Sequence, residues 1–121
     1  MLFRSGYFLV KMIDILSSQQ GRISDICASL GIRRLEVFGS AATGQFDVKH
    51  SDIDFIVEFG NFTGSGSLLN RYLELASQLE ALLGYRVDLL TPNSIRNPYF
   101  LQKVNESRVL IYEASIGEAS F

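Results

Sequence analysis

Two aspartates separated by one residue, Asp52 and Asp54, are the side chains of this sequence best placed to do chemistry. They open an apolar segment that runs to Phe59 and predicts a β-strand, in which side chains alternate between two faces. Asp52 and Asp54 are therefore expected on one face, with their Cα atoms roughly 6.5 Å apart. Two carboxylates at this spacing repel each other, and they can converge on metal ions about 3.5–4 Å apart.

A glycine–serine pair, Gly39 and Ser40, ends an earlier apolar segment and precedes two alanines that favour a short helix. Glycine lets a phosphate approach the backbone, the N–H groups at a helix start point toward it, and a serine hydroxyl adds a donor. Neither this pair nor Asp-x-Asp is a specific signal alone. Eleven residues separate Ser40 from Asp52, and apolar strands surround both motifs, so the combination is more informative than either part.

A third acid, Asp88, lies in the segment Arg86–Leu90, which predicts another strand. Its neighbours Val87 and Leu89 would face the opposite way. A lone acid in such a strand is more often a capped or paired structural residue, but together with the aspartate pair it would complete a three-carboxylate cage. Hard oxygen ligands of this kind select Mg²⁺, which keeps waters and takes further ligands from substrate phosphates.

The elements that must position these residues follow from periodicity and from capping residues. Predicted helices cover about residues 7–17, 23–30, 68–83 and 98–105, and predicted strands cover about 35–38, 52–59, 86–90 and 108–112. Helix ends are marked by Ser67, Asn97-Pro98, Gly31, Gly44 and Gly84. This order predicts an α/β (α+β) fold, a mixed β-sheet packed by helices, in one domain over residues 1–121 with a core at about 22–112. The leucine-rich segment 68–83 is interpreted as core.

Composition excludes several classes of protein. Of the 121 residues 47% are hydrophobic and 20% are charged, which is typical of a globular chain, and the net charge of −2 argues against strong nucleic-acid binding. The single cysteine, Cys27, falls among apolar residues at helical spacing and is interpreted as packing. The apolar run at residues 7–10 is too short for a signal peptide or a membrane span, so we expect a cytoplasmic protein.

The segments FGSAATGQFDVKHSDIDFIVEF and YRVDLLTP resemble the minimal nucleotidyltransferases of the DNA polymerase beta superfamily, and the likeness spans about residues 35–112. This resemblance implies that Gly39 and Ser40 hold the triphosphate of ATP and that Asp52 and Asp54 bind Mg²⁺. Asp88 would be the third metal ligand and a candidate base for the acceptor hydroxyl. The implied reaction is an in-line transfer of a nucleoside monophosphate with pyrophosphate leaving.

Small stand-alone proteins of this kind resemble the antitoxin of HEPN/MNT toxin–antitoxin pairs. The resemblance implies transfer of AMP from ATP to a tyrosine of a HEPN-family toxin, which silences the toxin, and association as a homo- or hetero-oligomer. Two alternatives stay open. One is a nucleotidyltransferase for a small molecule such as an aminoglycoside, and the other is a non-catalytic protein that inhibits its toxin by binding alone.

One position departs from the family pattern. Thr43 stands in the turn after Gly-Ser, where many relatives have an arginine that helps to neutralise phosphate. Three basic residues are candidates to replace it: Lys49, Arg71 and Arg86.

Two further polar residues have simpler interpretations. Glu58 lies about 13 Å along the strand from Asp54, too far to share an ion, and is interpreted as a surface charge. His50, the only histidine, sits in a polar segment and is expected to be solvated, with a substrate contact as the remote alternative.

Overall fold

The computed structural model describes residues 9–10, 12–47, 49–61 and 66–115. The strands are β1 (Leu9–Val10), β2 (Ile32–Phe38), β3 (Phe46–Asp47), β4 (Ile53–Phe59), β5 (Val87–Leu90) and β6 (Val109–Glu113). The helices are α2 (Met12–Ser18), α3 (Gln20–Ser29), α4 (Ser40–Thr43), α5 (Leu68–Leu83), the 3₁₀ helix η1 (Pro92–Ser94) and α6 (Pro98–Ser107).

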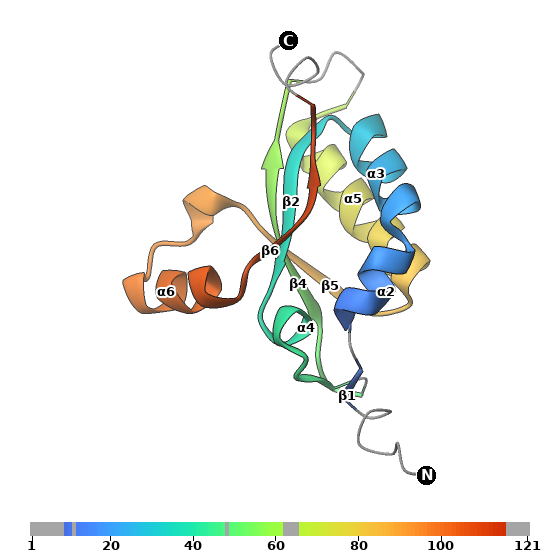
Figure 1. The fold of residues 1–121 in the computed structure, drawn as a ribbon. Helices are drawn as coiled ribbons and strands as arrows, with labels where there is room; N and C mark the ends of the chain where they lie inside the picture. The colour runs from blue at the N-terminus through green and yellow to red at the C-terminus, as the bar shows by residue number, and fades with distance from the viewer. Residues whose placement is uncertain (1–8, 11, 48, 62–65, 116–121) are drawn as a thin grey trace.

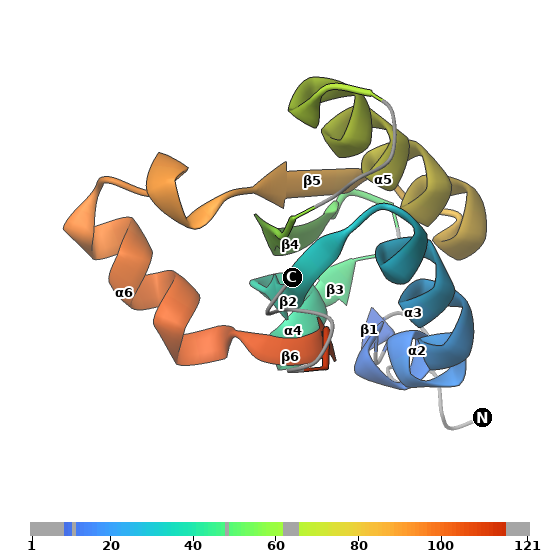
Figure 2. The same cartoon turned by 90° about the horizontal axis from the view of Figure 1, so that it is seen from above.

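A four-stranded mixed sheet in the order β5-β4-β2-β6 forms the centre of the molecule. Strand β4 pairs with β5 in parallel, whereas the β2–β4 and β2–β6 pairs are antiparallel. The parallel pair needs a long crossover connection, which α5 provides. Helices α2, α3 and α5 cover one face of the sheet, and α6 lies on the opposite side (Figures 1 and 2). The predicted fold class is confirmed.

Local capping residues account for the helix boundaries. The Ser67 hydroxyl accepts a hydrogen bond from the Asn70 N–H, and α5 ends at Gly84 in the left-handed conformation. The Asn97 side chain accepts hydrogen bonds from two N–H groups in the first turn of α6, which starts with Pro98. These boundaries agree with the prediction.

The main core lies between the sheet and the three-helix layer. Ile53, Phe55 and Val57 point into it from alternate positions of β4. Cys27 is fully buried in this core, and burial raises the pKa of its thiol to about 12, so it packs as an apolar residue rather than as a nucleophile. Within the described ranges, no helix combines the length and apolar composition needed to span a bilayer.

Two sequence-based predictions are wrong. Residues Leu9–Val10, expected in a helix, form β1 and pair antiparallel with β3, while Tyr7 and Phe8 lie outside the described residues. The first turn of α5 is not core: Leu68 and Leu69 are 57% and 63% exposed. Apolar spacing defines which side of a helix faces inward, but it does not define where along the axis the neighbouring layer begins.

Candidate active site

The second face of the sheet, opposite the three-helix layer, carries the acidic residues. Asp54 lies on this face because its strand neighbours Ile53 and Phe55 are buried in the main core. In the parallel β4–β5 pair Asp54 is directly opposite Asp88, and on the other side its partner in β2 is Phe38. Directly paired residues in a sheet project to the same face, so Asp54 and Asp88 are neighbours. Asp52 directly precedes β4.

The charges of the three acids act on one another at Asp54. Burial, followed by repulsion from Asp88 and then from Asp52, raises the pKa of the Asp54 carboxyl from 3.8 to about 6. Among the described residues, however, no three His, Cys, Asp or Glu side chains converge closely enough to hold a metal ion. The acids are therefore close enough to repel one another but do not form a closed cage.

The Gly39–Ser40 turn lies against Asp54. Gly39 has φ 73° and ψ −148°, a conformation essentially restricted to glycine, and a Cβ placed on it would lie 2.9 Å from Asp54 Oδ2. Ser40 is the first residue of α4, which ends at Gly44. The structure thus brings the glycine–serine pair and the acids to the same end of β2 and β4.

Basic groups surround Asp52. The Arg86 guanidinium Nε lies 3.4 Å from Asp52 Oδ1, and the arginine side chain is 83% exposed. Lys49 and His50 line the same surface depression as Asp52 and Arg86. The depression therefore combines one acid of the site with cationic groups suited to a phosphate.

Arg71, the remaining candidate to replace an arginine at position 43, lies elsewhere. Its guanidinium donates hydrogen bonds to the carbonyls of Leu30, Gly31 and Gly60 and packs over the Phe59 ring at 5.1 Å. Phe59 lies five residues along β4 from Asp54, a distance of about 16 Å. Arg71 is a structural residue, and the expectation that it could serve the site is wrong.

Glu58 and His50 each lie next to a charged residue. Glu58 is opposite Arg34 in the β2–β4 register. The hydrogen bond to Glu36 is the main cause of the raised pKa of Arg34, and the charge of Glu58 adds to it. His50 is exposed, and its Nδ1 lies 3.0 Å from Asp47 Oδ2. Neither position contradicts its interpretation.

The end of α6 and the acid Glu36 were not singled out by sequence analysis. Glu36 lies on the same face as the acids but is only 4% exposed, and its carboxylate accepts hydrogen bonds from Arg108 and Arg34. Just before Arg108, the Ser107 hydroxyl accepts a 2.9 Å hydrogen bond from the Gly39 N–H. The sequence carries one signal for Glu36. It is an acid between the apolar residues Leu35 and Val37, so in a strand it faces the opposite way from both.

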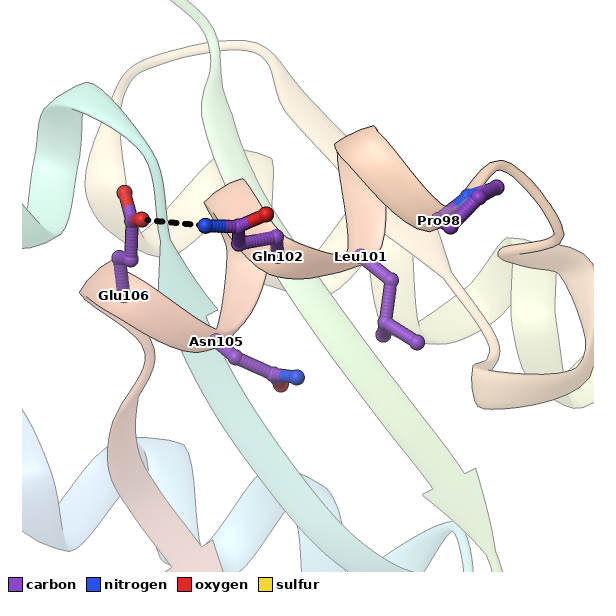
Figure 3. Close-up of a pocket in the computed structure, with 5 residues that line it drawn as sticks. All are labelled: Pro98, Leu101, Gln102, Asn105 and Glu106. Atoms are coloured by element: carbon purple, nitrogen blue, oxygen red, sulfur yellow. Dashed lines mark hydrogen bonds between the residues drawn. The ribbon is translucent and has the colours of Figure 1, made fainter.

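A second depression lies along α6 itself and contains none of the three aspartates or of the glycine–serine pair. Figure 3 shows Leu101 and Asn105 on one side of the helix, and Gln102 with Glu106 on the other. The Gln102 amide donates a 3.4 Å hydrogen bond to the Glu106 carboxylate.

Comparison with known proteins points to one family. Residues 8–111 match the model of the nucleotidyltransferase domain. The chain is 38% identical over 80 residues to a Methanocaldococcus jannaschii protein provisionally named a protein adenylyltransferase, covering 66% of this chain and 77% of that one. A solved structure provisionally described as a minimal nucleotidyltransferase superposes with a TM-score of 0.63 at 29% identity, covering 83% of this chain and 95% of the other.

A further solved structure shares the fold. It comes from a complex of a tri-AMPylated Shewanella oneidensis HEPN toxin with an MNT antitoxin, and the TM-score is 0.53. The identity is 19%, and the match covers 82% of this chain and 73% of the other. At this identity the likeness concerns the fold alone.

Proposed function

Because this chain belongs to the nucleotidyltransferase domain family, we propose that it transfers AMP from ATP to a hydroxyl group of a partner protein. The partner we propose is a HEPN-family toxin, the acceptor is a tyrosine, and the modification silences the toxin. The adenylyltransferase name of a relative supports the reaction. The shared fold with an MNT antitoxin in complex with an AMPylated HEPN toxin supports the choice of partner.

One observation carries the proposal: Asp54 has two acidic neighbours and a glycine turn packed directly against it. Burial, and after it the like charges of Asp88 and Asp52, raises the pKa of Asp54 to about 6. Mutual repulsion of this kind opposes folding, so the placement of these acids side by side indicates a ligand-binding role rather than a stabilising one. The backbone at Gly39 lies directly against the same carboxylate, where a Cβ would be 2.9 Å from Asp54 Oδ2, and we propose that this glycine turn binds the phosphate.

The donor set fits Mg²⁺. Carboxylates are the hard oxygen ligands that Mg²⁺ prefers, and a divalent cation would relieve the repulsion at Asp54. We propose that Asp52, Asp54 and Asp88 hold the metal, with Asp52 turning away from Arg86 to do so. When bound, Mg²⁺ would neutralise charge on the triphosphate.

The protein residues then have separate roles in the transfer. Gly39 and Ser40 hold the triphosphate in line with the acceptor. The acceptor oxygen forms a bond to the α-phosphorus of ATP, the bond from that phosphorus to the bridging oxygen breaks, and pyrophosphate leaves. The proton of the acceptor hydroxyl passes to the Asp88 carboxylate, which is exposed at the site. Arg86 and Lys49 take over the phosphate contact that Thr43 cannot make.

Mass spectrometry of the partner tests this function. The chain is incubated with Mg-ATP and the protein encoded by the adjacent reading frame, and the partner is expected to gain one or more AMP units. The gain should be lost with Asp54→Asn and kept with Glu58→Gln, a matched control on the same strand and face. Tandem fragmentation should locate AMP on a tyrosine.

Other outcomes are equally informative. An unchanged partner mass together with tight binding would replace the enzyme by a toxin inhibitor that acts through contact alone. AMP transfer to an aminoglycoside but not to the partner would assign a small-molecule substrate. Either result overturns the proposed function.

A further inference from the structure

The hydrogen bond between Gly39 and Ser107 continues the pairing of two strands beyond their ends. In the antiparallel β2–β6 pair the last partners are Val37 and Val109. Two residues further along this register, Gly39 stands opposite Ser107. Ser107 is the final residue of α6, where the backbone is helical, so its side chain supplies the acceptor that a strand carbonyl would otherwise offer.

The helix that carries Ser107 is anchored on both sides of this contact. On the C-terminal side, Arg108 bonds to the buried Glu36 of β2. On the N-terminal side, Val104 is buried with Phe38 and Ile56, and the Phe100 ring packs edge-to-face on Phe38. These contacts restrict where the Ser107 hydroxyl can lie relative to the turn.

We infer that Ser107 is a positioning residue for nucleotide binding, an inference that rests on the proposed function. Its hydroxyl fixes the orientation of the Gly39 peptide, and thereby the direction in which the glycine–serine turn faces beside Asp54. Gly39 has no side chain, so neighbouring groups must determine its conformation. Without the acceptor the Gly39 N–H loses its partner, and the turn samples orientations that do not fit a triphosphate.

The inference makes two measurable predictions for Ser107→Ala. Amide hydrogen exchange of Gly39, followed by NMR without nucleotide, should become about fivefold faster, and the Kd for Mg-ATP should rise about fivefold, the factor for loss of one hydrogen bond. The kcat for AMP transfer should change less than KM, since Ser107 does not touch the reacting atoms. Ser107→Thr, which keeps the hydroxyl, should restore both values.

Ser29→Ala is the matched control. Ser29 also ends a helix, α3. Its hydroxyl donates a hydrogen bond to the Ile26 carbonyl three residues earlier, as the Ser107 hydroxyl does to the Val104 carbonyl, but it makes no hydrogen bond to the Gly39–Ser40 turn. Ser29→Ala should leave the hydrogen exchange of Gly39 and the Kd for Mg-ATP unchanged. If the role of Ser107 were only structural, Ser107→Ala would lower the Tm without changing the Kd. Wild-type exchange at Gly39 in Ser107→Ala, or faster exchange with an unchanged Kd, would overturn the inference. A wild-type chain that binds no Mg-ATP would instead overturn the proposed function.

Discussion

Replacing Asp54 by asparagine should stabilise the protein while abolishing AMP transfer. The folded state holds the Asp54 carboxylate in partial burial beside Asp88 and Asp52, which raises its pKa from 3.8 to about 6. Asparagine has nearly the same shape but carries no charge. The substitution therefore removes the repulsion without leaving a cavity.

The size of the effect follows from proton linkage. Each pKa unit corresponds to about 1.4 kcal/mol, which would give about 3 kcal/mol, and solvent screening at this partly exposed carboxyl reduces the value to about 1–2 kcal/mol. A raised pKa means that the folded state binds the proton more tightly than the unfolded state. The contribution of Asp54 to the stability of the wild type is thus fully present below pH 3.8 and is lost as the pH rises through about 6.

Urea unfolding at two pH values provides the assay. At about pH 8, Asp54→Asn should be more stable than the wild type by about 1–2 kcal/mol, with a Tm higher by roughly 4–8 °C. At about pH 4 the two should differ little, because Asp54 is then protonated in the wild type. Glu58→Gln, on the same face but away from the acids, should change stability by less than about 0.5 kcal/mol at either pH.

Two results would refute this reasoning. If Asp54→Asn lowers stability at pH 8, the carboxylate makes favourable contacts that outweigh the repulsion. If the difference between the variant and the wild type is independent of pH, the charge of Asp54 is not its cause. Added Mg²⁺ should reverse the order of stability at pH 8 by raising the Tm of the wild type alone.

Three further substitutions test other parts of the site. Gly39→Ala should destabilise the fold by about 1–3 kcal/mol and reduce AMP transfer at least about tenfold, since the new Cβ collides with Asp54. Gly84→Ala is the control: Gly84 also has a positive φ but has open space around it, so this variant measures the backbone cost alone. Arg86→Ala should raise KM for Mg-ATP about tenfold but change stability by less than about 1 kcal/mol, because its ion pair is exposed; an unchanged KM would leave the phosphate contact to Lys49. Glu36→Gln should cost about 1–3 kcal/mol near neutral pH. Burial alone would raise the pKa of Glu36, but hydrogen bonds from Arg108 and Arg34 outweigh it and lower the pKa, so urea unfolding should show that the contribution of Glu36 disappears as the pH falls below 4.5.

Local features of the sequence predict most of the secondary structure. Helix α5 begins after Ser67 and ends before Gly84 as predicted, because a side-chain cap and a left-handed glycine act on adjacent backbone. Alternation along a strand likewise predicts that Asp54 and Ile53 face opposite ways. The short strand β1 could not be predicted, because its two residues are in a strand only through pairing with β3, far along the chain.

The part of the site that escaped prediction depends on the relative position of strands. No local pattern states that Asp88 pairs with Asp54 or that Ser107 stands opposite Gly39, since both relations follow from the register of distant segments. The acids could be identified because chemistry restricts the residue types that bind a metal. A serine at a helix end has many ordinary uses, and only the register distinguishes Ser107 from Ser29. Residues that position a site are therefore harder to predict from sequence than residues that react, and Ser107, Arg108 and Glu36 belong to the first kind.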